Sequence, residues 1–435
     1  MTKKPDKKPA WHSIYVHDSN CNGCVVCLRA CPTRAIRVKQ GKAVILPELC
    51  IDCGECIRVC PNEALVPRVS TYKEVATFKI KAVFPSPALY NQFGKDTLPN
   101  DILLALTKLG FDYVFDIGVF CEMVSWAQIE WLKRNPDLRP IISFMCPVVV
   151  RLIAKRFPNL IPHFISIEPP RETAAKYIRR FLHKKTGLAD EAIGVFQITP
   201  CAAKMVAINR PMALKKSYLN GALGISDIYG DILLSLKEIT EEDRDLMLFR
   251  SSGLGIGWDT SGGEAAGLRL NEPTLAASGL AEVIEVLEQI EAGQLKEVAF
   301  VECRACPDGC LGGPLTVENR YMARSTVTNL VQMFGTLPRV RPRDVDHLIR
   351  EGFFSLEKEI KPLLFPLDKD PLKAIEKLER ADEITARLPG RLCGACGAPD
   401  CRTLAEDVVL GKAQLSDCPF ADEALLAEFK EEDKK

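Results

Sequence analysis

The sequence has no excess of either charge, because 57 lysine and arginine residues balance 57 aspartate and glutamate residues in 435 positions. Such a chain has no global attraction to a polyanion, so we expect no nucleic-acid partner. It also lacks a run of about 18 apolar residues, and no apolar segment follows its charged first residues. We therefore expect neither a membrane span nor a signal peptide, and a cytoplasmic location.

Cysteine, by contrast, is abundant, with 18 residues in the chain. A cytoplasm keeps thiols reduced, so dense cysteines there bind metals or take part in chemistry, and disulfides are rare. Sixteen of the eighteen fall into four groups of four. The groups therefore predict several metal centres.

Two of the groups form an internal repeat near the N-terminus. The pattern C-x2-C-x2-C-x3-C-P occurs twice, displaced by 29 residues. Thiolates suit the iron of a 4Fe–4S cubane, and in two-cluster ferredoxins the cysteine before proline ligates the other cluster of the pair. We therefore predict a ferredoxin-like domain over residues 11–68 with two 4Fe–4S clusters. The expected ligands are Cys21, Cys24, Cys27 and Cys60 for one cluster, and Cys50, Cys53, Cys56 and Cys31 for the other.

A third group lies near the C-terminus, in residues 389–421, with the spacing C-x2-C-x4-C-x16-C. Four cysteines can bind either zinc or an iron–sulfur cluster. The segment resembles a small single-cluster 4Fe–4S domain of bacterial electron-transfer proteins, which favours iron. The expected ligands are Cys393, Cys396, Cys401 and Cys418.

The region between these groups, residues 78–350, alternates short apolar strands with amphipathic helices. This order favours an α/β domain with mostly parallel sheets. The predicted strands are Ile80–Phe84, Tyr113–Ile117, Ala192–Ile198 and Glu297–Val301, and the predicted helices are Asp101–Leu109 and Leu280–Ala292. The fold class is thus a multidomain α/β protein. Residues 351–388 are expected to form a helical linker, 1–10 a basic tail and 422–435 a charged tail.

The cysteines of this central domain lie in three segments with distinctive neighbours. They are Phe144-Met145-Cys146-Pro147, Thr199-Pro200-Cys201-Ala202-Ala203-Lys204 and Glu302-Cys303-Arg304-Ala305-Cys306-Pro307-Asp308-Gly309-Cys310-Leu311-Gly312-Gly313-Pro314. In this order they resemble the three signature motifs of the FeFe hydrogenases. The surrounding domain is similar too, including Phe84-Pro85-Ser86-Pro87 and Gln92-Phe93-Gly94.

The resemblance implies an H-cluster, which is a 4Fe–4S cubane joined by a thiolate to a two-iron unit with CO and cyanide ligands. Its cubane would be held by Cys146, Cys201, Cys306 and Cys310. Cys310 would bridge to the two-iron unit, and Lys204 would hydrogen-bond one of the cyanides. A compact ammonium is a suitable donor to an anionic ligand.

Several positions depart from the pattern of highly active members. Met145 stands where those members have a proton-relaying cysteine, and a thioether has no exchangeable proton. Ala207 and Arg304 replace a usual glutamate and a usual methionine. These departures resemble a divergent branch of the family that is regarded as hydrogen-sensing and often carries a C-terminal cluster domain. Cys121 and Cys303 remain outside all sets and are expected to be buried thiols.

The expected function is that of a slow FeFe hydrogenase, an anaerobic oxidoreductase that interconverts H2 with protons and electrons and could sense hydrogen. Three accessory 4Fe–4S clusters would pass the electrons to a redox or signalling partner such as ferredoxin, and maturation proteins would supply the two-iron unit. The alternative is a non-catalytic hydrogenase-like iron–sulfur protein, for cluster assembly or electron transfer, without the two-iron site.

Overall fold

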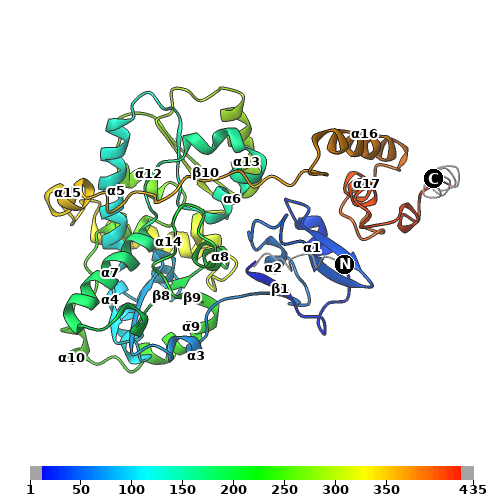
Figure 1. The fold of residues 1–435 in the computed structure, drawn as a ribbon. Coiled ribbons are helices and arrows are strands. Elements are labelled where there is room, and N and C mark those ends of the chain that lie inside the picture. The colour runs from blue at the N-terminus through cyan, green and yellow to red at the C-terminus, as the bar shows by residue number, and fades with distance from the viewer. Residues whose placement is uncertain (1–11, 423–435) are drawn as a thin grey trace. The chain divides into compact units, whose positions relative to one another are not determined.

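The computed structural model describes residues 12–422, which form two compact units (Figure 1). One unit combines the N-terminal part up to Pro67 with the chain from Leu364 onward, and the other spans Arg68–Leu363. The predicted basic tail 1–10, and the charged tail beyond Asp422, lie outside the described residues. Within residues 12–422 no helix is both long and apolar enough to cross a membrane.

The N-terminal part of the first unit repeats itself in backbone conformation as well as in sequence. Left-handed φ angles recur 29 residues apart at Gly23 and Asp52, Val25 and Gly54, and Arg34 and Glu63. Two short antiparallel ribbons and two short helices complete the repeat. Their bounds are β1 Ile14–Val16, α1 Val26–Ala30, β2 Ile36–Lys39, β3 Lys42–Ile45, α2 Glu55–Arg58 and β4 Leu65–Pro67, with β1 pairing β4 and β2 pairing β3.

The C-terminal part of the same unit is built on two helices, α16 (Pro371–Arg387) and α17 (Cys401–Val409). Ala381 and Ile384 of α16 are buried in one core with Leu404 of α17. The second half of the predicted linker 351–388 is therefore a helix of the C-terminal core, because its apolar face has a partner to pack against.

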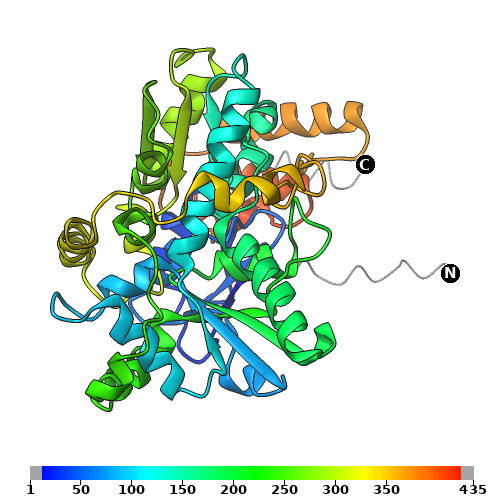
Figure 2. The same ribbon diagram turned by 90° about the vertical axis from the view of Figure 1, so that its left-hand side faces the viewer.

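The second unit contains two parallel sheets. In Figure 2 the larger sheet is drawn as blue to green arrows, and β10 and β11 of the smaller sheet are drawn as olive arrows. The larger has the strand order β6-β5-β8-β9, and the smaller β10-β11-β7. The strand bounds are β5 Ile80–Pro85, β6 Tyr113–Val114, β7 Ile141–Ile142, β8 Ile193–Thr199, β9 Gly221–Gly224, β10 Thr274–Ser278 and β11 Phe300–Arg304. The predicted α/β class with parallel sheets is confirmed.

Helices pack around both sheets. Their bounds are α3 Tyr72–Val75, α4 Pro99–Lys108, α5 Ile117–Arg134, α6 Pro147–Arg156, α7 Pro170–Thr186, α8 Ala203–Asn209, α9 Ile225–Leu236, α10 Glu241–Arg244, α11 Gly253–Gly257, α12 Gly263–Leu268, α13 Leu280–Glu291, α14 Arg320–Phe334 and α15 Pro342–Arg350. The predicted helices at 101–109 and 280–292 correspond to α4 and α13. Strand β8 is buried along its whole length, as expected for a central parallel strand.

Candidate metal centres

The cysteine motifs of the second unit all follow the carboxyl ends of parallel strands. The segment with Cys201 follows β8, and the segment with Cys306 follows β11. Cys146 comes shortly after β7 and immediately before α6. Ser86 follows β5 in the same way. Ligand sites in open α/β sheets lie outside the carboxyl ends of the strands, so the fold itself brings these segments together.

The predicted H-cluster residues line one cavity. They share this wall with several apolar and proline side chains. The predicted members of the lining are Met145, Cys146, Cys201, Lys204, Cys306 and Cys310. Cys121 and Arg304 line it as well, whereas Ala207 lies in a neighbouring pocket and Cys303 is buried in β11.

The surroundings of the cavity raise the pKa of cysteine thiols and so disfavour free thiolates. Burial, helped by neighbouring Cys146, raises the pKa of Cys201 to about 11. Burial also raises the pKa of Cys310, while Lys204 and Arg304 oppose the shift. A bound metal supplies the positive charge that such thiols need in order to ionise. Four thiols that converge on one cavity therefore fit a cubane.

Lys204 lies inside this cavity and is only 7% exposed, so it is not a solvated surface lysine. Its Nζ donates to Ser86 Oγ at 3.5 Å, and the Ser86 hydroxyl donates to the carboxylate of Asp259. Asp259 lines the same cavity. The ammonium group is thus held at a fixed place with donor capacity to spare.

Arg171, at the start of α7, is a cavity residue that the sequence did not reveal. Its guanidinium is buried and donates from Nη1 to the backbone oxygen of Met145 at 3.1 Å. Its Nε has no hydrogen-bond partner among residues 12–422. Burial lowers its pKa, although Glu172 and then Cys146 act in the opposite direction. No motif marks Arg171 in the sequence, although Pro169 and Pro170 mark the start of its helix.

Arg304 belongs to a buried ionic network behind the third motif. Its Nη2 donates to Glu264 at 3.0 Å and its Nε to Glu302 at 3.1 Å. Burial raises the pKa of Glu264 to about 7, and Arg304 opposes the shift. Ser143 Oγ donates to Glu264 at 2.7 Å and accepts from the backbone of Met145 at 3.3 Å. The network thus extends to Met145, which stands at the position of the proton-relaying cysteine in highly active members.

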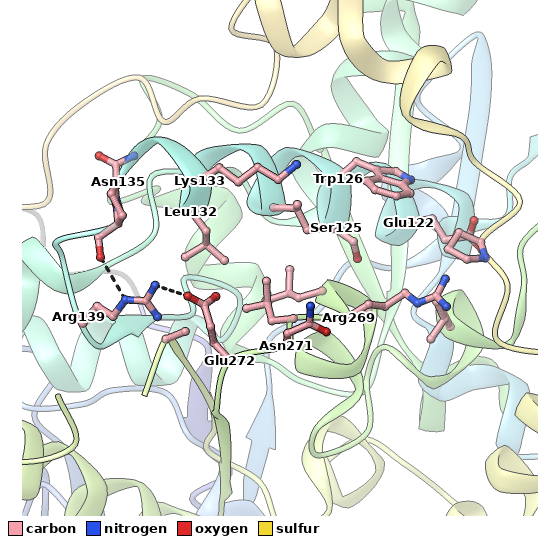
Figure 3. A pocket seen from close by; sticks show the side chains of 18 of the residues that line it. Glu122, Ser125, Trp126, Leu132, Lys133, Asn135, Arg139, Arg269, Asn271 and Glu272 are labelled. Carbon is pink, nitrogen blue, oxygen red and sulfur yellow. Dashed lines mark hydrogen bonds and ion pairs between the residues drawn. The ribbon is translucent and has the colours of Figure 1, made fainter. Parts of the chain in front are cut away.

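A second, larger cleft lies along α5 (Figure 3). Its volume is about 600 Å³, and the ion pair of Arg139 with Glu272 lies at one end. The wall is mainly apolar, with Trp126 on the α5 side. Trp258 lines both this cleft and the cysteine cavity.

In the first unit, the structure brings cysteines of the two motifs close to one another across the repeat. The electrostatic neighbours of Cys27 include Cys21, Cys24 and Cys60, and burial together with these neighbours raises its pKa to about 11. Cys53 in turn has Cys31 as a neighbour across the repeat. Backbone N–H groups of Ala35 and Ala64 donate to the sulfurs of Cys31 and Cys60 at 3.2 Å each.

The C-terminal cysteines also lie together, since Cys393 and Cys418 are electrostatic neighbours of Cys396. Four converging thiolates suit either zinc or an iron–sulfur cluster, so this geometry alone does not choose between the two.

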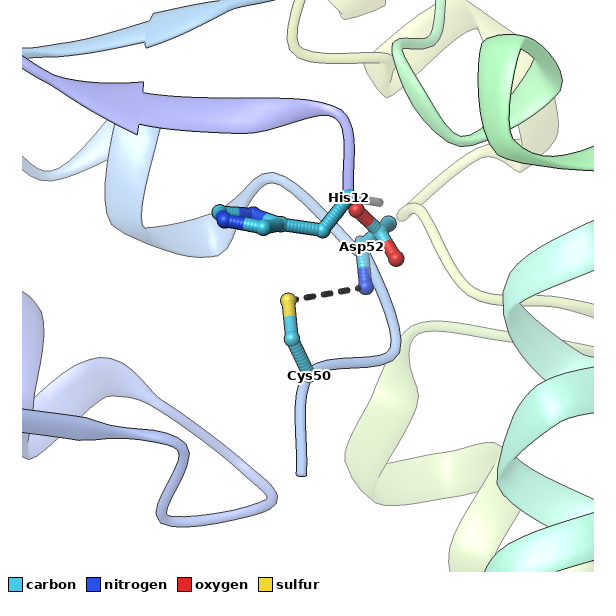
Figure 4. Close-up of side chains that lie close together, drawn as sticks. All are labelled: His12, Cys50 and Asp52. Carbon is cyan, nitrogen blue, oxygen red and sulfur yellow. Dashed lines mark hydrogen bonds between the residues drawn. The ribbon is translucent and has the colours of Figure 1, made fainter. Parts of the chain in front are cut away.

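His12 and Asp52 lie close to Cys50, which is a predicted cubane ligand (Figure 4). The backbone N–H of Asp52 donates to the Cys50 sulfur at 3.3 Å. Its carboxylate accepts from the backbone and hydroxyl of Ser13 at 2.7 and 2.9 Å. Because Cys50 is expected to bind a cluster, these residues form the environment of that cluster and no separate metal site.

Fold and cysteine sets together define an iron–sulfur protein with a hydrogenase-like domain. The sequence profile described as "Iron only hydrogenase large subunit, C-terminal domain" matches residues 79–269 and 264–314, more than half of the chain. The chain therefore belongs to this family. Profiles described as "4Fe-4S dicluster domain" and "Putative Fe-S cluster" match residues 13–61 and 388–420.

Individual relatives are distant and differ in kind. The chain is 23% identical over 301 residues to the NADP-reducing hydrogenase subunit HndD of Solidesulfovibrio fructosivorans, covering 54% of this chain and 49% of the relative. It is 26% identical over 263 residues to iron hydrogenase 1 of Clostridium pasteurianum, covering 54% and 44%. The chain thus spans about half the length of these relatives. A probable cytosolic Fe-S cluster assembly factor of Drosophila mojavensis is 22% identical over 320 residues, covering 60% and 66%.

Solved structures agree on the fold. A variant of the FeFe hydrogenase HydA1 from Chlamydomonas reinhardtii matches with a TM-score of 0.53 at 17% identity. The match covers 67% of this chain and 98% of that one. At this identity the likeness establishes the hydrogenase-like fold alone.

Proposed function

We propose that this protein is an FeFe hydrogenase of the divergent, hydrogen-sensing kind that interconverts H2 with protons and electrons slowly. The observation that carries the proposal is the convergence of four cysteines and buried Lys204 on one cavity. Its location would be the cytoplasm, and its accessory clusters would exchange electrons with a redox or signalling partner.

In this proposal Cys146, Cys201, Cys306 and Cys310 would hold the cubane, and Cys310 would link it to the two-iron unit. The bound H-cluster supplies the redox chemistry. Lys204 would donate a charge-assisted hydrogen bond to an anionic cyanide ligand.

Other cavity residues shape the surroundings of the cofactor. Arg171 adds a second buried positive charge to the cavity wall, and its Nε–H has no hydrogen-bond partner among residues 12–422. Apolar residues such as Ile117 and Val148 limit the access of water. Met145 cannot pass a proton, which makes proton delivery slow.

The rival function, suggested by the assembly-factor relative, is that of a protein holding only cubanes. A buried ammonium costs free energy unless it has partners. The Lys204 ammonium donates to the Ser86 hydroxyl at 3.5 Å, the upper limit for a hydrogen bond. A cyanide ligand would be a further acceptor and would offset the cost of burying the charge. This argument favours the hydrogenase.

Hydrogen evolution by anaerobically prepared protein, loaded with the two-iron unit by maturation proteins, tests the proposal. We expect slow but measurable evolution from a reduced low-potential dye, abolished in Cys310→Ser. Rates in the loaded wild type no higher than in Cys310→Ser would support the non-catalytic alternative.

A further inference from the structure

The C-terminal cluster domain is docked on the N-terminal dicluster domain, although more than 300 residues separate them in sequence. The strongest contact is a buried ion pair between Arg37 of β2 and Asp407 of α17, whose side chains are 5% and 7% exposed. Arg37 Nη2 donates to Asp407 at 3.0 Å, and its Nε bonds to the other carboxylate oxygen. A buried charge pair of this kind fixes geometry, since either charge alone would be costly to bury.

The cysteine loop of the C-terminal domain takes part in the docking through its backbone. Val38 N–H of β2 donates to the carbonyl of Gly397 at 2.9 Å, as it would to a neighbouring strand. Gly397 has a φ of +80°, and a Cβ at this position would overlap the carbonyl oxygen of Val38. Only glycine therefore allows the close approach, and Gly397 directly follows the predicted ligand Cys396.

The contact continues onto α1, which lies within the first N-terminal cysteine motif. Arg29, between Cys27 and Cys31, donates from Nη2 to the carbonyl of Cys393 at 2.8 Å. A Cβ on Gly394 would lie 3.4 Å from Leu28 and 3.5 Å from Val25, which are ordinary contact distances. The ligand loops of two clusters thus touch each other.

We propose that the C-terminal cluster exchanges electrons directly with the cluster of Cys21, Cys24, Cys27 and Cys60. One electron leaves the reduced C-terminal cluster, which is oxidised by one unit, and reduces the neighbouring cluster by one unit. No bond breaks and no proton is required. Touching ligand loops keep the tunnelling distance short, so the first unit is a three-cluster electron-transfer module. The inference needs the accessory clusters but not the two-iron unit.

Electron paramagnetic resonance on the full chain, isolated without the two-iron unit and reduced with a Eu(II) chelate, tests the inference. Neighbouring reduced clusters couple magnetically, which broadens their lines and speeds their relaxation. We expect wild type to show this coupling and Cys396→Ser to lose the part due to the C-terminal cluster. The double variant Arg37→Ala/Asp407→Ala removes both buried charges and should retain wild-type iron content, yet show a several-fold slower relaxation of the C-terminal cluster.

The matched control is Lys377→Ala/Asp368→Ala, which removes an ion pair at α16 within the C-terminal domain. Its spectrum should match wild type. A wild-type spectrum equal to the sum of uncoupled clusters, with Cys396→Ser merely removing one component, would overturn the inference. Full coupling in the Arg37→Ala/Asp407→Ala variant would overturn the role of the docking contact. Because no measurement involves hydrogen, failure here is distinct from failure of the proposed hydrogenase function.

Discussion

Met145 is buried beside Cys146 and lines the cysteine cavity, which is where a proton donor would be most effective. A thiol has a reference pKa of about 8.5 and can exchange a proton, whereas a thioether cannot. Met145→Cys should therefore raise hydrogen evolution, by up to about 10²-fold if proton delivery at this position limits the rate. Ala207 could keep the gain smaller. The measurement is dye-driven evolution at matched H-cluster occupancy.

Met123→Cys is the control for this substitution, because it introduces the same thiol at a buried methionine of α5. It should leave the rate unchanged. Equal rates for wild type and Met145→Cys across about pH 6–9, which brackets the reference pKa of a thiol, would show that proton supply at this position does not limit turnover.

Among the residues that line the cysteine cavity, the sequence predicted the four cysteines and Lys204 but not their neighbours. Metal-ligand motifs are local, so their spacing is legible in a single chain. Arg171, Asp259 and Cys121 reach the cavity from distant segments and carry no motif. Their role depends on tertiary contacts that periodicity cannot express. The ligand assignments themselves stay predictions until the clusters are observed.

Among the elements, α5 depends on its cap. The Asp116 carboxylate accepts from the backbone N–H of Gly118 at 2.9 Å and from the hydroxyl of Tyr90 at 3.0 Å. Its other oxygen accepts from the backbone N–H groups of Arg250 and Ser251 at 2.9 and 2.8 Å. One buried side chain thus anchors the helix N-terminus, the segment after β5 and the loop before α11.

Asp116→Ala should lower the free energy of unfolding of this domain by at least about 3 kcal/mol, because several buried donors lose their acceptor at about 1–3 kcal/mol each. Anaerobic denaturation followed by circular dichroism measures the loss. Asn319→Ala, which removes an exposed cap of α14, should cost only about 1 kcal/mol. Equal losses for the two variants would contradict the anchoring role of Asp116.

Element boundaries show where sequence patterns fail. The predicted strand 297–301 starts and ends three residues before β11, Phe300–Arg304. The apolar pattern stops at Val301 because Glu302 and Arg304 are charged, but their mutual ion pair permits burial inside the strand. Likewise, the predicted strand 113–117 is cut short by Asp116, which caps α5. The burial of an ion pair and the capping of a helix depend on the folded structure, so local sequence patterns do not reveal them.

For the whole molecule, the predicted class and the three iron–sulfur regions agree with the family matches. The docking of the C-terminal domain on β2 could not be predicted, because Arg37 and Asp407 are 370 residues apart and each looks like an ordinary surface charge in sequence. Long-range pairing of this kind follows from shape complementarity, which only the folded chain displays.

Infrared spectroscopy of the matured protein tests the central claim most directly, because only a two-iron unit carries CO and cyanide ligands. We predict CO and cyanide stretching bands in wild type. Cys396→Ser should keep these bands, since the C-terminal cysteines belong to the other compact unit, whereas Cys310→Ser should lose them. A matured wild-type sample with full cubane content and no such bands would contradict the account and leave a hydrogenase-like protein that holds cubanes alone.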